Sequence, residues 1–260
     1  MLGAIAGDVI GSVYEARPVK TTEFPLFDEA CRFTDDTVLT VAVADCLLNG
    51  RSYVDAFHEY WRAYSHAGFG GSFTHWAMSN NLEPYNSWGN GSAMRVSPVA
   101  YAFEQLHEVL AEAERSASIT HSHDEGIRGA QATAAAVFLA RKGEEKAKIR
   151  DYVESQFGYD LHRSLEQIRP EYEFDVSCQG SVPESIISFL ESEDFESSLR
   201  NAISLGGDAD TMACIAGAIA EPFYGGVPEP IARRVVNRLD GPLKNVLVEF
   251  SGRYINQGDD

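Results

Sequence analysis

Carboxylate side chains gather at two places where the sequence predicts that a helix begins. Residues 34–37 read TDDT before the helical pattern of 38–48, and residues 206–211 read GGDADT before that of 212–220. Threonine and aspartate are common helix N-caps, so capping explains either motif by itself. A cap needs one side-chain oxygen, whereas the two segments together carry four carboxylates. Burying that much negative charge is costly unless cations compensate it.

The oxygen-rich chemistry of these segments indicates which cations would suit them. Carboxylate and hydroxyl oxygens select magnesium, manganese or calcium over zinc. The glycine pair before Asp208 permits a sharp turn that would bring Asp208 and Asp210 toward one point. Two such segments facing each other would form a two-metal clamp, which also suits a metal-dependent phosphoesterase.

A third group of residues lies near the start of the sequence. Gly3, Gly7 and Gly11 stand four apart and share one face of a predicted helix, where another backbone could approach closely. Asp8 and Glu15 would lie on one side of this helix, two turns apart, if the helix continues that far. Glu15 is the natural candidate for a general acid or base. The alternative is a solvated carboxylate at a helix end.

The remaining pattern predicts helices rather than strands. Apolar residues recur at three- and four-residue spacing in 38–48, 93–103, 127–139, 185–190 and 231–239. Residues 212–220 are apolar all round, which predicts a central buried helix. The two longest irregular stretches are expected at 67–92 and 159–180, and no repeat or linker divides the chain. We therefore predict an all-α bundle in a single domain over residues 1–255, with a frayed tail at 256–260.

The composition disfavours several classes of protein. Among 260 residues, 39 Asp and Glu against 21 Lys and Arg give a net charge of −18. This charge disfavours nucleic acid and anionic membranes as partners, although a need for solubility explains it equally well. No segment has the length of a transmembrane helix or the pattern of a signal peptide. The four cysteines form no C-x-x-C pair, so neither a zinc site nor a disulfide framework is expected, and a reducing cytoplasm fits best.

Five motifs together resemble the ADP-ribosylglycohydrolase family and occur in that family's order. They are GDVIGSVYE at 7–15, TDDT at 34–37, GNGSAMRVSPVA at 89–100, THSHDEGIRGA at 120–130 and GGDADTMACIAGAI at 206–219. The resemblance implies an all-α bundle with two Mg²⁺ or Mn²⁺ ions in a cleft. It also implies hydrolysis of the N- or O-glycosidic bond that attaches ADP-ribose to a protein side chain or a small molecule, with ADP-ribose as the product.

The resemblance also assigns roles to residues of the carboxylate motifs. The implied metal ligands are Thr34, Asp35, Asp36, Asp208, Asp210 and Thr211. Glu15 matches the family's glutamate near the scissile bond, and Asp8 has a supporting role. Glu15, or an aspartate such as Asp35 or Asp36, would act as general base or acid.

Substrate contacts are expected from the two middle motifs. The residues concerned are Asn90, Gly91, Ser92, Met94, Arg95, His121 and His123. The backbone N–H groups of 88–92 could point at a diphosphate, and the alternative is a routine turn with Ser92 as a helix cap. Arg95 would pair with a phosphate or with a carboxylate of this acidic protein. His121 and His123 lack a third ligand spaced for zinc, so they are expected to contact substrate or to be purely structural.

Several questions stay open at the level of sequence. Tyr64, Phe69, Phe73 and Trp76 either stack on adenine or belong to the core. The family also contains lens crystallins without enzymatic activity, so a metal-binding or structural protein is an alternative to the hydrolase. The linkage that would be cleaved, to arginine, to serine or in O-acetyl-ADP-ribose, is not specified by these motifs.

Overall fold

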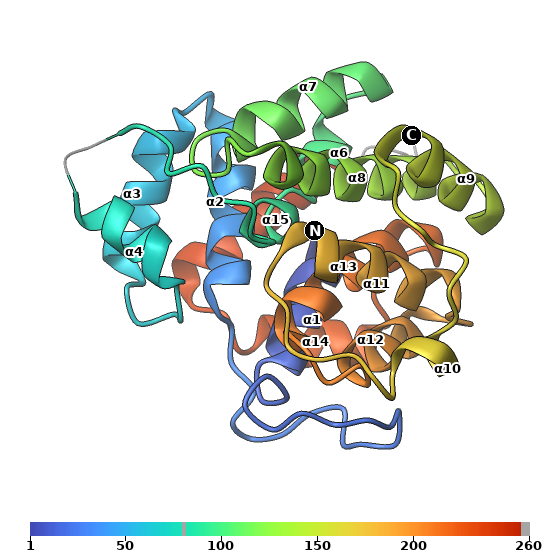
Figure 1. Cartoon of the computed structure of the whole chain (residues 1–260). Helices are drawn as coiled ribbons and strands as arrows, with labels where there is room; N and C mark the ends of the chain where they lie inside the picture. Colours follow the sequence, from blue (N-terminus) through green and yellow to red (C-terminus); the bar gives the residue numbers. More distant parts are fainter. Residues whose placement is uncertain (80–81, 256–260) are drawn as a thin grey trace.

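The computed structural model describes residues 1–79 and 82–255, so the tail predicted at 256–260 lies outside the described residues. Within these ranges the chain forms fifteen helices and no strand, apart from one isolated antiparallel bridge between Gly89 and Ser177 (Figure 1). The all-α prediction is confirmed. The helices are α1 (Leu2–Gly11), α2 (Asp35–Asn49), α3 (Tyr53–Ala63), α4 (Gly71–Met78), α5 (Gly91–Met94), α6 (Val99–Ala102), α7 (Leu106–Ala117), α8 (Asp124–Arg141), α9 (Lys146–Phe157), α10 (Leu165–Ile168), α11 (Cys178–Leu190), α12 (Phe195–Ile203), α13 (Ala209–Phe223), α14 (Glu229–Val236) and α15 (Gly241–Tyr254).

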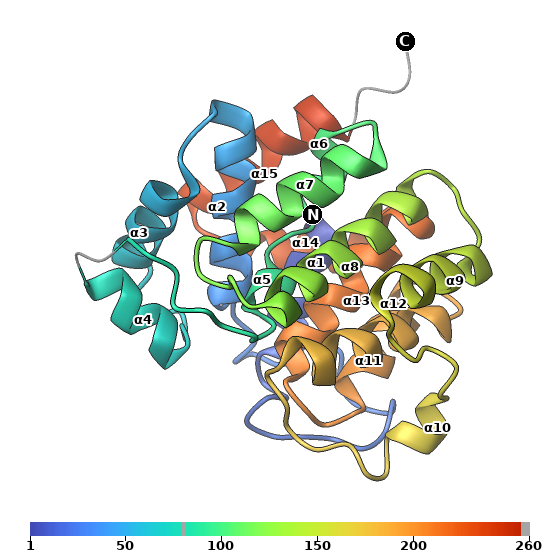
Figure 2. The same cartoon turned by 45° about the horizontal axis from the view of Figure 1, so that its top comes forward.

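Two helices from opposite ends of the sequence form the centre of the bundle. Every residue of α13 from Ala209 to Glu221 is buried, and α1 is buried from Gly3 to Gly11. The prediction of a central buried helix over 212–220 is confirmed, and α1 is internal as well. Helices α8, α11 and α12 pack around α13, and Figures 1 and 2 show α3 and α4 together at one edge of the molecule. Among the described residues, no helix is long and apolar enough to cross a membrane.

The glycine stripe of α1 lies directly against the backbone of α13. A Cβ atom added at Gly7 would stand 2.0 Å from the carbonyl oxygen of Ala213, and one at Gly11 would stand 2.5 Å from Cα of Asp210. Gly3 meets Gly217 in the same way, at 2.2 Å from its carbonyl oxygen. Only glycine permits this approach, so the predicted contact between two backbones is confirmed.

Two predicted helices have different boundaries in the structure. Helix α1 ends at Gly11, so Glu15 is in the turn that follows, where the amide of Tyr14 donates to the carbonyl of Gly11 at 2.7 Å. The residues between α1 and α2, 12–34, form the longest stretch without a helix in the described ranges, and the sequence analysis did not identify it. It runs along the lower edge of the bundle in Figure 1, in blue.

The helix predicted over 93–103 is divided into α5 and α6. Pro98 has no amide hydrogen to donate to the carbonyl of Met94, and a proline also disfavours helical backbone at the residue before it. The Met94 carbonyl instead accepts from the hydroxyl of Thr40 at 3.3 Å and from the thiol of Cys214 at 3.3 Å. Side chains of α2 and α13 thus replace the missing bond and hold α5 in place.

The irregular stretches also contain short helices that the sequence did not predict. Helix α4 lies within 67–92, and α10 lies within 159–180, where Ser164 and Gln167 form a capping box. The helix predicted from residue 185 begins earlier, at Cys178, where the side chain of Ser177 accepts from the amide of Gly180 at 3.1 Å. Short helices of this kind have too few apolar positions to produce a periodic pattern.

Substitution of Gly7 by alanine tests the contact between α1 and α13. The Cβ would overlap a main-chain oxygen that cannot move independently, so we expect a loss of about 2 kcal/mol or more in the free energy of unfolding, as overpacking typically causes. Chemical denaturation measures it. Gly252→Ala is the matched control, because nothing lies within 4 Å of its added Cβ and alanine gains up to about 1 kcal/mol in a helix. Equal effects of the two substitutions would contradict the close contact.

Candidate metal centre and active site

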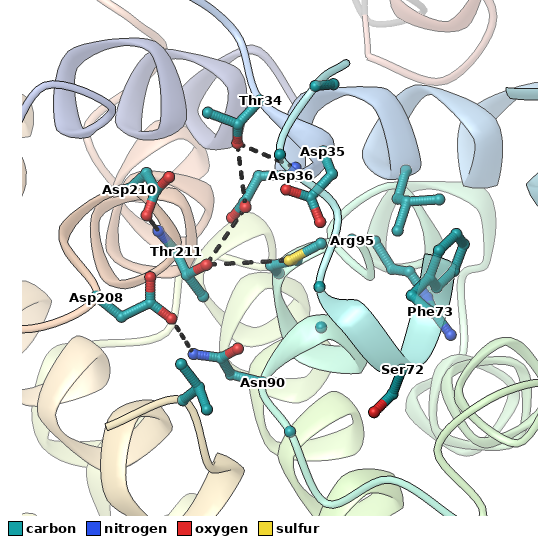
Figure 3. A pocket seen from close by; sticks show the side chains of 18 of the residues that line it. Thr34, Asp35, Asp36, Ser72, Phe73, Asn90, Arg95, Asp208, Asp210 and Thr211 are labelled. Carbon is teal, nitrogen blue, oxygen red and sulfur yellow. Dashed lines mark hydrogen bonds between the residues drawn. The ribbon is translucent and has the colours of Figure 1, made fainter. Parts of the chain in front are cut away.

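A pocket of about 380 Å³ opens where the N-terminal ends of α2, α5 and α13 meet. Its size is within the range of small-molecule sites. Figure 3 shows the carboxylates of α2 and α13 facing each other on one side, with Phe73 and Ser72 on the other. The two carboxylate motifs, 175 residues apart at Asp36 and Thr211, are therefore brought together.

Asp8 organises the N-terminal end of α2. Its buried carboxylate accepts from the amide of Thr34 at 2.9 Å and from the amide of Thr37 at 3.1 Å. The hydroxyls of Thr34 and Thr37 donate to it as well, that of Thr34 at 2.7 Å. Four donors thus saturate the carboxylate. Because the Thr34 hydroxyl donates its hydrogen to Asp8, its oxygen acts as an acceptor toward other groups; it accepts from the amide of Asp36 at 3.3 Å as the cap of α2 and keeps one lone pair for another partner.

The carboxylates on the pocket side have few donors. Asp36 Oδ2 accepts from the Thr211 hydroxyl at 3.3 Å, whereas its Oδ1 is buried without a hydrogen-bond partner. Asp208 occupies the N-cap position of α13 without capping it. Its Oδ2 accepts instead from the side-chain amide of Asn90 at 2.7 Å. Capping, which the sequence offered as the simple explanation, leaves Asp208 unexplained.

Five carboxylates converge in two overlapping groups. One oxygen from each of Asp8, Asp36 and Asp210 lies within 4.8 Å of the others, and the same holds for Glu15, Asp208 and Asp210. Asp210 belongs to both groups. In the described part of the chain, no lysine or arginine forms an ion pair with any of these five carboxylates.

Burial and mutual repulsion raise the pKa values of these carboxyl groups. Burial, followed by the charges of neighbouring aspartates, holds the pKa values of Asp36 and Asp210 well above their usual range. Burial and the charge of Asp208 also raise the pKa of Glu15, while Arg32 opposes the shift. Oxygen donors, an unpartnered buried oxygen and uncompensated negative charge are the features that suit hard divalent cations.

Asp35 is separate from both carboxylate groups, although it lines the same pocket. Its backbone amide donates to the carbonyl of Ala67 at 2.9 Å, and its side chain is half-buried. Burial, then the charge of Asp8, raises the pKa of Asp35 to about 7. Its carboxyl group therefore changes charge near neutral pH.

The residues predicted to contact substrate fall into two sets. Asn90, Gly91, Met94, Arg95 and His121 line the pocket. Ser92 and His123 do not. The Ser92 hydroxyl is buried and donates to the carbonyl of Gly126 at 2.7 Å, and His123 caps α8 by accepting from the amide of Glu125 at 3.1 Å.

Of the two partners that the sequence suggested for Arg95, a phosphate or a carboxylate, the described residues do not provide the carboxylate. It is fully buried, and its Nη2 donates to the carbonyl of Ser116 and the hydroxyl of Thr120, both at 2.9 Å. The guanidinium carbon stands 4.5 Å from the centre of the Phe57 ring. Arg95 is thus a buried cation beside the pocket, and the described residues give it no carboxylate partner.

Of the four aromatic residues considered for adenine stacking, Phe73 alone lines the pocket. Tyr64 and Trp76 are buried in the core, and the Tyr64 hydroxyl donates to Asp240 at 2.8 Å. Phe69 stacks on Phe73, with ring centres 5.2 Å apart. The core interpretation therefore holds for most of this set.

Comparison with known protein families gives one match across residues 1–257, to the model described as ADP-ribosylglycohydrolase. The chain belongs to the ADP-ribosylglycohydrolase family. The resemblance drawn from the five motifs is confirmed, and the chain is an enzyme that hydrolyses ADP-ribose linkages.

Relatives of this glycohydrolase include proteins named ADP-ribosylhydrolase and a protein named ADP-ribosylarginine hydrolase. Human ADP-ribosylhydrolase ARH3 is 29% identical over 86% of this chain and 84% of its own length. ADP-ribosylarginine hydrolase Tri1 of Pseudomonas putida is 25% identical over 90% of this chain and 72% of its own length. A solved structure titled ADP-ribosylglycohydrolase-related protein complex superimposes with a TM-score of 0.70 at 25% identity, covering 96% of this chain and 94% of that one.

Several residues that line the glycohydrolase pocket were not identified from the sequence. They are Arg32, Tyr85, Ser87 and Val176, together with Gly70 and Ser72 beside Phe73. Most of them lie in the two irregular stretches that the sequence analysis marked, and long irregular stretches in compact domains are often functional. Arg32 lies in the 12–34 segment, and only its position just before TDDT could have drawn attention to it.

Asp36→Asn tests the repulsion between the buried carboxylates. A folded-state pKa above the unfolded value means that the folded protein binds more protons, so stability falls as pH rises toward that folded pKa. An asparagine at position 36 does not titrate, so the variant does not lose this stability as pH rises. Without metal, the variant should gain stability over wild type between pH 5 and pH 8. One pKa unit corresponds to about 1.4 kcal/mol, so we expect a gain of at least about 1 kcal/mol at pH 8.

Thermal unfolding of metal-free protein at the two pH values measures this gain. Added magnesium should stabilise wild type more than Asp36→Asn, so that wild type becomes the more stable protein. The control is Asp194→Asn. Asp194 caps α12, and the hydrogen bond from the amide of Ser197 lowers the pKa of its carboxyl group. The stability that this charged group contributes is therefore fully present above the pKa of an unfolded aspartate. The stability lost in Asp194→Asn should be the same at pH 5 and at pH 8. A pH-independent loss of stability in Asp36→Asn would contradict the electrostatic argument.

Proposed function

We propose that this glycohydrolase requires Mg²⁺ or Mn²⁺ and releases ADP-ribose from an N- or O-glycosidic linkage to a protein side chain or a small molecule. The observation that carries this proposal is the convergence of five carboxylates, without a cationic partner, on one pocket of about 380 Å³. A folded protein tolerates such a cluster when cations complete it. The family membership supports the same chemistry.

Two cations are proposed because the carboxylates form two groups that share Asp210. The proposed ligands are Thr34, Asp36, Asp208, Asp210 and Thr211 at these groups, together with Asp35, which lies outside both groups but lines the same pocket. Asp8 supports the first group from behind, since its own oxygens are already bonded to donors from 34 and 37. When bound, divalent cations supply Lewis acidity that orients ribose oxygens and stabilises developing negative charge.

Glu15 is proposed as the general acid or base. It is placed next to Asp208 and Asp210 by the turn after α1, yet its side chain remains exposed to the pocket opening. Its raised pKa makes proton exchange near neutral pH easier than for an ordinary glutamate. Asp35, whose pKa is raised to about 7, is the alternative group. A water directed by either carboxylate would attack the anomeric carbon as the glycosidic bond breaks.

The opposite side of the pocket is proposed to hold the rest of ADP-ribose. Asn90 is already engaged by Asp208, so its role is to fix that carboxylate. Gly91 and His121 lie together, because a Cβ added at Gly91 would stand 3.3 Å from the imidazole. Met94 and Phe73 add apolar surface. Loops 82–90 and 169–177 are joined here by the bridge between Gly89 and Ser177, so both can contact the ligand.

Product analysis tests the reaction. Purified protein with magnesium or manganese is incubated with peptides ADP-ribosylated on arginine or on serine and with O-acetyl-ADP-ribose, and products are identified by mass. We expect free ADP-ribose from at least one substrate, and none after chelation or in the Asp208/Asp210 double alanine variant. AMP as the product would show a phosphoesterase instead. No product from any substrate with either metal would favour a binding protein.

Glu15→Gln separates chemistry from binding. The substitution keeps the size of the side chain and removes its ability to exchange a proton, so single-turnover rates should fall by about 10²- to 10⁴-fold. The affinity for ADP-ribose, measured by calorimetry, should change little. Asp35→Asn, tested in parallel, compares the alternative group. If Glu15→Gln stays within about threefold of wild type while Asp35→Asn loses most of its activity, the proton-transfer role belongs to Asp35.

A further inference from the structure

Arg95 is a buried cation in the wall of the pocket. It is fully buried, but only its Nη2 has hydrogen-bond partners, and Nε and Nη1 have none. A buried charge without a counter-ion is costly, so its retention beside the ligand pocket calls for an explanation. One of its two acceptors, the hydroxyl of Thr120, is also hydrogen-bonded to the imidazole of His121.

The direction of the first hydrogen bond between Arg95 and His121 follows from chemistry, and it limits the second. A guanidinium can only donate, so Thr120 Oγ1 accepts from Nη2 at 2.9 Å. The Thr120 hydroxyl keeps one hydrogen of its own, and Nδ1 of His121 lies 2.8 Å from that oxygen. When this hydrogen is donated to Nδ1, the ring must carry its proton on Nε2.

One alternative arrangement would reverse the last bond. The Tyr85 hydroxyl also faces Thr120 and could receive the threonine hydrogen, leaving Nδ1–H to donate to Thr120. This arrangement would direct the positive end of an N–H dipole toward the Arg95 guanidinium. The field of the cation favours the lone pair of Nδ1 on that side instead. Burial and Arg95 also lower the pKa of His121 well below its usual range, so the ring stays neutral.

The other ring nitrogen lies beside Gly89 and Gly91, two glycines that line the pocket. A Cβ added at Gly91 would lie 3.3 Å from Nε2 of His121, and one at Gly89 would lie 3.7 Å from it. His121 is 4% exposed and lines the pocket, and Nε2 forms no hydrogen bond with the described residues. The free N–H is therefore available to a ligand.

We propose that Arg95, acting through the Thr120 hydroxyl, fixes His121 as a neutral imidazole whose Nε2–H donates to an oxygen of the bound ADP-ribose. Arg95 is on this basis a positioning residue, and His121 is the ligand contact. A neutral imidazole of fixed orientation presents one N–H to the ligand, so it accepts a ligand oxygen and rejects a ligand donor group at that position. A histidine that rotates or carries a charge would select less strictly. The ligand in this proposal rests on the proposed function, whereas the hydrogen-bond relay concerns the ligand-free protein.

Nuclear magnetic resonance of the ring nitrogens tests the relay without substrate. In wild type at pH 7, two-bond proton–nitrogen correlations should show His121 with Nε2 protonated and Nδ1 unprotonated and hydrogen-bonded, with the signals assigned by their loss in His121→Gln. Thr120→Val should shift the Nδ1 resonance toward that of a nitrogen without a hydrogen bond, and Thr120→Ser should restore it. Arg95→Met should weaken the same bond and Arg95→Lys should preserve it. A ring protonated on Nδ1, or on both nitrogens, in wild type would overturn the relay.

Calorimetry with ADP-ribose tests the consequence for binding. Thr120→Val should weaken affinity by about two- to tenfold, the effect of one lost hydrogen bond, and Thr120→Ser should not. Thr133→Val is the matched control, since Thr133 is a buried threonine of α8 whose hydroxyl has no partner. The maximal rate should change less than the affinity. Unchanged affinity in Thr120→Val would overturn the positioning role, and wild type that does not bind ADP-ribose would overturn the ligand assignment together with the proposed function.

Discussion

The contact between the backbones of α1 and α13 is the constraint on which the rest of the structure depends. It exists because glycine occupies the three positions of α1 that face α13, so the two helices approach more closely than side chains would permit. The last of these glycines, Gly11, lies against Asp210, and the turn that follows carries Glu15 to the same place. One packing interaction in the core therefore determines the distance between carboxylates that are far apart in sequence.

A second consequence of this contact is the placement of Asp8. Because α1 is fixed against α13, its Asp8 side chain reaches the start of α2 and satisfies the amides of Thr34 and Thr37. Free amides at a helix N-terminus favour a negative charge, so this buried carboxylate has a fuller local compensation than that of Asp210, which accepts from the single amide of Thr211 at 2.9 Å. Asp8 thus belongs to the scaffold, although one of its oxygens lies within 4.8 Å of oxygens of Asp36 and Asp210. The remaining carboxylates retain the unmet demand for positive charge that gives the pocket its chemistry.

The sequence predicted the features that depend on local pattern. The glycine spacing, the all-apolar segment 212–220 and the paired acidic motifs indicate the central helices and the oxygen-rich cluster. It did not predict the segment 12–34 or the division of the helix at Pro98. At this division the carbonyl of Met94 accepts hydrogen bonds from Thr40 and Cys214. The buried positions of Ser92 and Arg95 also escaped it. The proline is a local signal that the apolar periodicity of 93–103 outweighed, whereas the placements of Ser92 and Arg95 depend on partners elsewhere in the chain, which a periodic pattern does not encode.

The two sides of the pocket differ in charge, and this difference gives a direction to whatever binds there. The carboxylates of α2 and α13 occupy one side, whereas Arg95 is buried beside the other, behind Phe73 (Figure 3). The two do not neutralise each other, because Arg95 forms its bonds with Ser116 and Thr120 rather than with an aspartate. A ligand with an anionic group at a distance from a hydroxyl-rich sugar matches this arrangement, since cations at the carboxylates would coordinate the hydroxyls while the field of Arg95 favours the anion. The same separation explains how an acidic protein of net charge −18 can accommodate a negatively charged ligand without a basic surface.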